Sequence, residues 1–79
     1  MKVLLFARAR DLAGEDAIEI DLPAGATVAE LRRALAIRYP KLAGLIERSA
    51  FAVDAEFAQE KTPIPATAVI ALLPPVSGG

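Results

Sequence analysis

The chain of 79 residues is long enough for one small domain and too short for a second. Nine Lys and Arg against ten Asp and Glu give a formal charge of −1, and the basic residues form no cluster suited to nucleic-acid phosphates. The sequence has no cysteine and no histidine, which excludes disulfides, thiolate and imidazole catalysis, and most zinc or copper sites. We therefore expect a protein that binds no nucleic acid and holds no metal.

An apolar segment opens the chain. Residues 2–8 are rich in Val, Leu and Phe and lead into a polar stretch, a pattern that predicts a strand buried on both faces. The run is too short for a signal peptide or a membrane span, so we expect a soluble, cytoplasmic protein without membrane contact. Residues 17–22 alternate between apolar and acidic side chains, which predicts a half-buried strand paired with the first in a hairpin around Gly14.

A helix is predicted to begin at Val28. Thr27 and Glu30 have the spacing of a capping box, in which each side chain accepts a hydrogen bond from the other residue's backbone N–H. Ile37 lies on the opposite side of this helix from its apolar stripe and is expected to be exposed. At about 100° per residue, four apolar side chains form the stripe that we expect to pack on the sheet: Val28, Leu31, Leu35 and Tyr39.

The second half of the chain contains further short elements. Pro40 is predicted to end the helix at Tyr39, because proline disfavours a helical backbone in the residue before it. Residues 41–47 are expected to form a short helical or irregular segment, followed by a strand at residues 51–53 and a short edge strand near residues 56–58. Residues 68–73 predict a last, strongly apolar strand, which Pro74 and Pro75 end.

The order of these elements predicts the fold class. Two strands, one main helix, one or two short strands and a final apolar strand indicate an α+β protein with a ubiquitin-like β-grasp fold. Its mixed sheet would hold four to five strands with the helix across it. The final strand is expected to be central and parallel to the first, since only the helix provides a crossover connection. We assign residues 1–73 to this domain and residues 74–79 to a flexible C-terminal tail.

The tail reads Pro-Pro-Val-Ser-Gly-Gly in sequence. At average glycine usage, a terminal Gly-Gly pair arises by chance in about one sequence in two hundred, so the pair alone is only suggestive. Pro74 and Pro75 favour an extended exit from the sheet, and six extended residues span about 20 Å. Because glycine lacks a Cβ atom, Gly78 and Gly79 would pass through a narrow tunnel and leave the terminal carbonyl open to a nucleophile.

The main-chain carboxylate of Gly79 is therefore the candidate reacting group. A free carboxylate is a poor electrophile at neutral pH, so it would first have to become an acyl-adenylate. The sequence contains no phosphate-binding loop of the pattern G-x-x-x-x-G-K-[ST]. We expect activation by another enzyme that uses ATP, with no cofactor bound to this chain. On the alternative interpretation, the tail is only a disordered chain end.

Two segments of the chain carry a resemblance to a known family. Residues 72–79, Leu-Leu-Pro-Pro-Val-Ser-Gly-Gly, are similar to the final strand, diproline and Gly-Gly ending of the MoaD-type sulfur carriers. Residues 3–14 are similar to the opening strand and following loop of the same proteins. The resemblance covers nearly the whole length and points to the MoaD/ThiS family, which contains the small subunits of molybdopterin synthase.

The resemblance implies a cycle of activation and sulfur transfer. An adenylating enzyme of the MoeB or ubiquitin-activating type would adenylate Gly79, and a sulfur donor would convert the adenylate into a thiocarboxylate. The MoaE-type large subunit of molybdopterin synthase would receive the tail and supply the catalytic groups, so the chain would not be an enzyme on its own. There the sulfur would pass to cyclic pyranopterin monophosphate in molybdenum cofactor biosynthesis. Five residues would thread the tail: Pro74, Pro75, Val76, Ser77 and Gly78.

By motif position, the resemblance also implies that Phe6, Arg10, Phe57 and Leu73 contact the partner. Phe6 and Leu73 lie in predicted strands, where composition alone favours core positions. Arg10 is, on the alternative interpretation, a solvated loop charge. Phe57 lies in a charged, proline-flanked stretch with few core neighbours, which favours an exposed anchor.

Other functions share the Gly-Gly ending. The chain would also suit a sulfur carrier for thiamine biosynthesis or tRNA thiolation, although the diproline before V-x-G-G favours molybdopterin synthase. A ubiquitin-like modifier would instead join Gly79 to target lysines through an isopeptide bond. A regulatory binding domain would need neither glycine, so that deleting Gly78 and Gly79 would leave its function intact.

Overall fold

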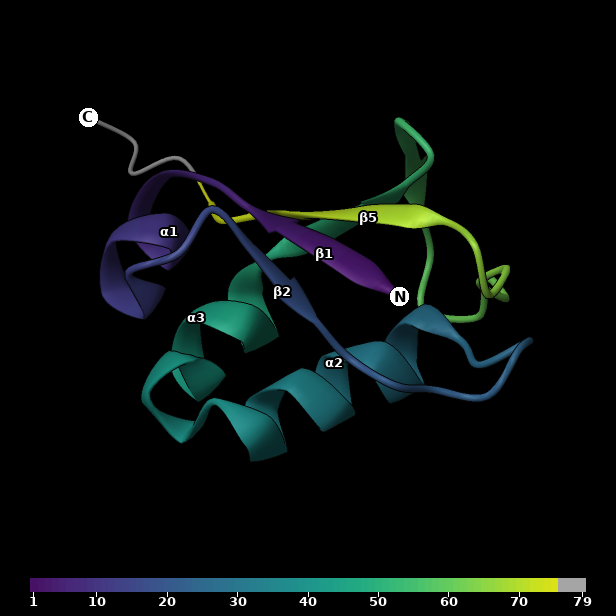
Figure 1. Cartoon of the computed structure of the whole chain (residues 1–79), viewed down its shortest axis with the longest axis horizontal. Coiled ribbons are helices and arrows are strands. Elements are labelled where there is room, and N and C mark those ends of the chain that lie inside the picture. Colours follow the sequence, from purple (N-terminus) through teal and green to yellow (C-terminus); the bar gives the residue numbers. More distant parts are fainter. Residues whose placement is uncertain (76–79) are drawn as a thin grey trace.

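The computed structural model describes residues 1–75, within which one sheet of five strands has the order β2-β1-β5-β3-β4 (Figure 1). Three helices and a short 3-10 helix, η1, complete this part of the chain. In chain order the elements are β1 (Lys2–Leu5), α1 (Ala7–Ala13), β2 (Ala17–Glu19), α2 (Val28–Arg38), η1 (Pro40–Leu42), α3 (Ala43–Arg48), β3 (Ala50–Val53), β4 (Glu56–Ala58) and β5 (Val69–Leu73).

The sheet is mixed, as predicted. The central strand β5 runs parallel to β1 and antiparallel to β3, while β2 and β4 pair antiparallel at the two edges. The chain passes through α2 and α3 between β1 and β5, and these helices lie together below the sheet (Figure 1). The predicted central position and parallel pairing of the last strand are therefore confirmed.

The hydrophobic core lies between α2 and one face of the sheet. Val28, Leu31 and Leu35 of the predicted stripe are buried, and Tyr39 packs against the same core at its edge. From the sheet they meet a layer of buried side chains that includes Val3, Leu5, Phe51, Ile70 and Leu72. The helix stripe was thus predicted correctly, as was the exposure of Ile37, which reaches 75%.

The start of α2 is held by the predicted capping box. The backbone N–H of Glu30 donates to Thr27 Oγ1 at 3.3 Å, and the backbone N–H of Thr27 donates to Glu30 Oε1 at 2.9 Å. The hydrogen bond from the Thr27 backbone is the main reason why the pKa of Glu30 is lowered from its ordinary value. The helix therefore begins where local hydrogen bonding satisfies backbone groups that have no partner within the helix.

The first quarter of the chain differs from its prediction. The strand predicted for residues 2–8 ends at Leu5, and its outer face carries the exposed Lys2 and the half-buried Leu4, so β1 is not buried on both faces. The hairpin around Gly14 was also wrong, although the antiparallel pairing of the two strands is confirmed, because the connection contains α1. The predicted second strand is shorter, ending at Glu19.

Two features account for helix α1: the backbone conformation of Ala7 and the burial of Ala9. Ala7 adopts φ +50°, which turns the chain abruptly from strand into helix. Ala9 is fully buried against the core, and Gly14, with φ +74°, ends the helix by donating its backbone N–H to the carbonyl of Arg10 at 2.8 Å. A segment of seven residues with one buried alanine has too weak a periodicity to predict a helix.

A hydrogen-bonded cluster around Arg32 joins α2 to the rest of the domain. Arg32 Nη1 donates to the carbonyls of Ile46 and Ser49 at 2.6 and 2.7 Å, at the end of α3. Its Nε and Nη2 donate to the two carboxylate oxygens of Glu60, which lowers the pKa of that side chain. The guanidinium also lies 4.9 Å from the centroid of the Phe51 ring. One side chain thus links α2, α3, β3 and the segment after β4.

Candidate functional site

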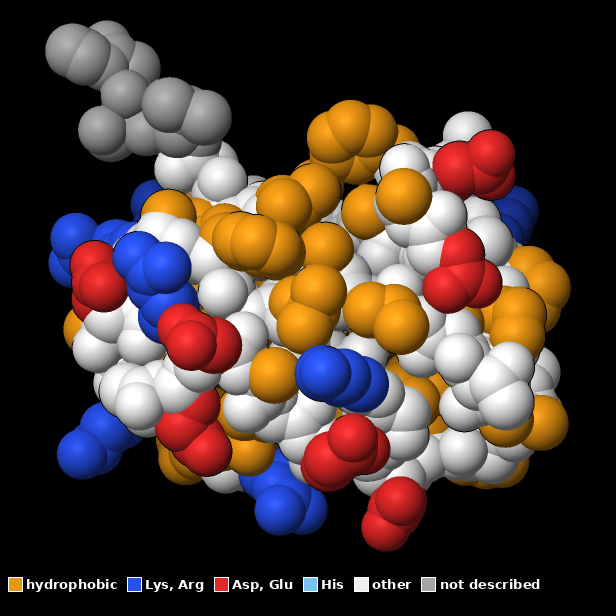
Figure 2. Space-filling model, turned by 45° about the horizontal axis from the view of Figure 1, so that its top comes forward, with side chains coloured by type: hydrophobic (Ala, Val, Ile, Leu, Met, Phe, Trp, Pro, Cys, Tyr) orange, Lys and Arg blue, Asp and Glu red, His pale blue; other side chains and the backbone are white. Residues whose placement is uncertain are grey.

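The face of the sheet that points away from α2 is mostly apolar and has no cover within residues 1–75 (Figures 1 and 2). Lys2 and Glu19 stand opposite each other at one end of it. Its side chains alternate with those of the core along each strand. Leu4 stands opposite Ala17 on one side and Ala71 on the other, and Ala52 stands between Ala71 and Phe57. We call this surface the apolar sheet face, made of Leu4, Phe6, Ala17, Ala50, Ala52, Phe57, Val69, Ala71 and Leu73.

Small and large apolar side chains are mixed on this face. The alanines at positions 17, 50, 52 and 71 keep much of it low, because each extends only one carbon atom beyond the backbone, and the half-buried Leu4 lies between Ala17 and Ala71. Phe57, Val69 and Phe6 are exposed by 79%, 43% and 42%. Exposed large apolar side chains beside low alanines provide a surface that another protein would cover favourably.

The structure places the four predicted partner-contact residues on or beside this face. Phe57 is exposed, as predicted. The core position that composition favoured for Phe6 is wrong, because Phe6 continues the alternation of β1 onto the face of Leu4, and its extended backbone precedes α1. Leu73 is half-buried on the same face, opposite Ala50. The contact of these residues with a partner stays a prediction.

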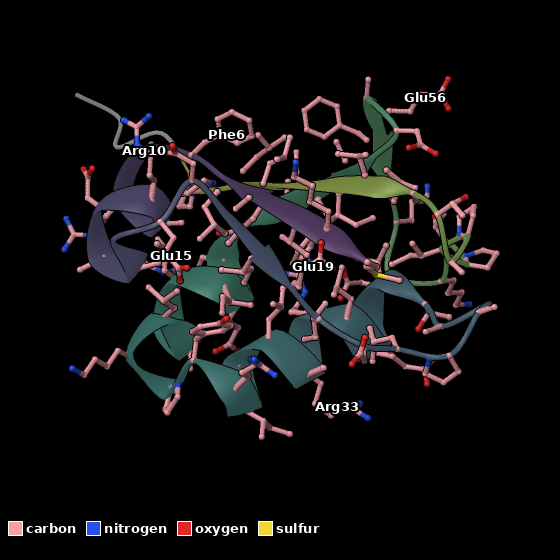
Figure 3. The ribbon with its side chains drawn as sticks, in the orientation of Figure 1. Phe6, Arg10, Glu15, Glu19, Arg33 and Glu56 are labelled. Carbon is pink, nitrogen blue, oxygen red and sulfur yellow. The ribbon has the colours of Figure 1, made fainter. Side chains whose placement is uncertain are left out.

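Arg10 lies on α1 rather than in a loop, and it is exposed. Figure 3 shows its guanidinium near Phe6, on the side of the sheet away from α2. Among residues 1–75 it forms no ion pair. Arg10 is therefore available to meet an acidic group on a protein that covers Phe6.

The tail begins at the same border of the face. Leu72 stands opposite Leu5, the residue before Phe6, and Leu73 is the last residue of β5 before Pro74 and Pro75. Leu73 and Phe6 therefore lie at the root of the tail, and Arg10 lies near Phe6 (Figure 3). Phe57 is farther away, on the edge strand β4. The predicted reacting residue Gly79 and the threading residues 76–78 lie outside the described residues.

Two other classes of site are absent from the described part of the chain. Within residues 1–75 no three acidic side chains come together in a way that would hold a metal ion. In the same range no helix has the length and apolarity needed to cross a membrane.

Comparison with known proteins gives the family. The model of the ThiS family matches residues 3–79. The chain belongs to the ThiS family. This ThiS-family chain is 40% identical over 81 residues to a protein of Dictyostelium discoideum named molybdopterin synthase sulfur carrier subunit, covering 99% of this chain and 94% of the relative. A protein of the same name from Arabidopsis thaliana is 32% identical, with 100% and 82% covered.

Solved structures confirm the ubiquitin-like β-grasp fold of the ThiS-family chain. SAMP1 from Haloferax volcanii has a TM-score of 0.83 and 28% identity, with 99% of this chain and 97% of the other covered. A subunit in a protein–protein complex of subunits 1 and 2 of molybdopterin-converting factor from Helicobacter pylori has a TM-score of 0.68 and 28% identity, with 99% and 96% covered. The predicted resemblance to the MoaD/ThiS family is thereby confirmed.

The sequence did not reveal which face of the sheet stays open, nor the cluster around Arg32, which lies on the α2 side and outside this surface. The alternation of Val69, Ala71 and Leu73 with the core residues of β5 is visible in the sequence, and it indicates that the strand is apolar on both faces. It does not indicate which face a helix of the same chain covers. Arg32 gave no local signal, because its partners lie 14 to 28 residues away.

Proposed function

We propose that this chain is the sulfur-carrier subunit of a molybdopterin synthase. The observation that carries the proposal is an apolar sheet face without cover in the described structure, placed where β5 leads into the tail. The proposal is supported by relatives over the whole chain that are named molybdopterin synthase sulfur carrier subunits. The globular part would then serve for docking, and the carboxylate of Gly79 would carry the sulfur.

The chemistry proceeds at the main chain of Gly79. Its carboxylate attacks the α-phosphorus of ATP within the adenylating enzyme, and pyrophosphate leaves. Hydrosulfide or an equivalent sulfur donor then attacks the acyl-adenylate carbonyl and expels AMP, which leaves a thiocarboxylate. In the synthase the thiocarboxylate sulfur displaces an oxygen substituent from a carbon of cyclic pyranopterin monophosphate, which joins the pterin to Gly79 as a thioester. Water then hydrolyses the acyl–sulfur bond, so the sulfur stays on the pterin and Gly79 becomes a carboxylate again. Because glycine has no Cβ, each nucleophile reaches the carbonyl without steric obstruction.

The large subunit would dock on the apolar sheet face. The related H. pylori complex of subunits 1 and 2 supports such a partner. Phe57, Phe6 and Leu73 would supply apolar contact area, and Arg10 would pair with an acidic group beside the tail root. A second protein, the adenylating enzyme, would cover the same face in turn, because it must receive the same tail.

A protein modifier is the rival function that the name of one similar structure suggests. One of the similar structures is described as small archaeal modifier protein 1 from H. volcanii, at 26% identity and a TM-score of 0.82. Such a modifier would use the same adenylate but pass its acyl group to a lysine amine. The names of the sequence relatives and the chemistry of the tail support sulfur transfer instead.

Intact-mass analysis separates these functions. We expect wild-type protein, incubated with its adenylating enzyme, ATP and sulfide, to gain the mass difference between sulfur and oxygen. A variant that lacks Gly78 and Gly79 serves as the control and should fold normally but gain no mass. The charged protein should then convert cyclic pyranopterin monophosphate to molybdopterin when the large subunit is added. Lysine conjugates without any thiocarboxylate would overturn the sulfur-carrier proposal.

A further inference from the structure

A surface groove lies at the C-terminal end of α1, which is the end farther from Phe6. It has a volume of about 350 Å³ and lies between the last residues of α1 and the turn through η1. We call it the α1–η1 groove. Its apolar and aromatic lining consists of Leu12, Ala13, Tyr39, Pro40 and Leu42.

The groove exposes apolar surface that the domain does not need for its own core. Leu12 is 52% exposed, whereas Ala9, one turn earlier on the same helix, is fully buried. Tyr39 and Ala13 are only partly buried and pack against the core from the other side. The floor of the groove is therefore apolar, fixed to the core and open to a ligand.

Both charged residues that line the groove are cations. Arg38 and Lys41 form no ion pair among the residues that the structure describes. The guanidinium of Arg38 lies 5.9 Å from the centroid of the Tyr39 ring, which places its charge above the aromatic floor. The acidic residues Glu15 and Glu19 line an adjoining hollow, which shares Arg38 and Tyr39 with the groove. The charge of the α1–η1 groove is thus complementary to an acidic ligand.

The groove and the apolar sheet face lie at opposite ends of the short helix α1. This helix starts directly after Phe6 and carries Leu12 near its other end. Seven helical residues extend only about 10 Å, so a protein that covers Phe6 has little distance to cross before it reaches the groove. Figure 1 shows α1 beside the C-terminal end of β5 and above the turn that follows α2.

We propose that the α1–η1 groove is a second docking site, occupied by an acidic segment with a large apolar side chain. The segment belongs to a protein partner that covers the apolar sheet face at the same time. The large side chain fills the space beside Leu12 and Tyr39, and its acidic neighbours pair with Arg38 and Lys41. This inference rests on the proposed function, because it assumes that the sheet face docks a protein.

Charge reversal at the groove tests the proposal. The variant R38E/K41E is compared with R33E/K61E, which makes the same change in net charge at two exposed residues that do not line the groove. Association rates are measured with the purified large subunit and with the adenylating enzyme, at low and high salt. For at least one partner we expect the groove variant to associate about tenfold more slowly at low salt, with a smaller loss at high salt. The control should stay within about twofold.

Leu12→Ala tests the apolar part separately. Its side chain is half exposed, so we expect normal thermal unfolding but a dissociation rate several-fold higher for the same partner. Wild-type rates for both partners with R38E/K41E and Leu12→Ala would overturn the groove proposal, as would equal losses in the control. If Phe57→Asp still abolished binding in that case, the sheet-face docking of the proposed function would stand. If neither partner bound wild-type protein, both proposals would fail.

Discussion

The two faces of the sheet carry apolar side chains on alternate residues of the same strands, yet one face is buried in the core and the other stays exposed. One face packs Val3 and Ile70 against Leu31 and Leu35 of α2 and is fully buried. The other presents the apolar sheet face with Phe57 at its border. The chain has only one helix of more than seven residues in its described part, and that helix covers one face. The same apolar strands therefore form the domain core with one face and, on our proposal, a docking surface with the other.

The composition of the two faces differs in a way that matches these uses. The covered face has branched and aromatic side chains that fill the space under α2. The open face has four alanines, which expose little apolar area while the partner is absent. Its most exposed large apolar groups, Phe57, Val69 and Phe6, lie on the edge strand or at strand ends, where a partner would bury them. This division limits the exposed apolar area of the free protein and keeps anchors for docking.

The largest expected effect on stability lies on the covered face. Ile70→Ala removes a fully buried side chain beneath α2, so the free energy of unfolding should fall by about 2–5 kcal/mol. Urea unfolding followed by circular dichroism measures this change. The matched variant Leu73→Ala, on the open face of the same strand, should cost clearly less. Equal losses at the two positions would show that the faces do not differ in their contribution to the fold.

The open face should show the reverse pattern, with a large effect on docking and a small one on folding. Phe57→Asp places a charge where a partner would bury an aromatic ring, and we expect affinity for the large subunit to fall about a hundredfold. The free energy of unfolding should change by less than about 0.5 kcal/mol, because Phe57 is 79% exposed. Titration calorimetry measures the affinity, with Ile37→Asp as an exposed control on α2. Unchanged affinity would place the interface elsewhere.

A loss of stability smaller than that of Ile70→Ala is expected at the start of α2, the helix that packs on the covered face. Thr27→Ala removes the hydrogen-bond acceptor of the capping box and should lower the free energy of unfolding by about 1 kcal/mol, without changing the affinity for partners. The measurement is thermal unfolding at several pH values. A drop in partner affinity equal to that of Phe57→Asp would contradict the separation of the two faces.

The same cap contributes to the pH dependence of stability. Thr27 holds the pKa of Glu30 below its ordinary value of 4.5 in the folded state. The stabilisation is therefore present above pH 4.5 and is lost as the pH falls through the lower folded pKa. Glu60, whose pKa Arg32 lowers, acts in the same direction. Glu30→Gln should reduce the loss of stability in acid, and an unchanged acid transition would contradict this account of the cap.

Elements with local signals were predicted well. Helix α2 begins at Val28 and ends at Arg38, one residue before the predicted end, because its capping box and Pro40 lie within a few residues of its ends. The tail chemistry was likewise proposed from adjacent residues, and Gly79 remains a prediction because it lies outside the described residues. Helix α1 was missed, because it depends on the burial of Ala9 and on the unusual backbone of Ala7.

The sequence by itself determined the order of the strands along the chain, the limits of the main helix and the unbroken apolar run that makes β5 apolar on both faces. These features depend on residues within about one helical turn or a few strand positions of one another. Only the tertiary structure decided that α2 covers the face of Ile70 and leaves that of Ala71 open. It also brought Phe6, Arg10 and Leu73 together at the tail root, because β1 and β5 are neighbours only after the chain has folded.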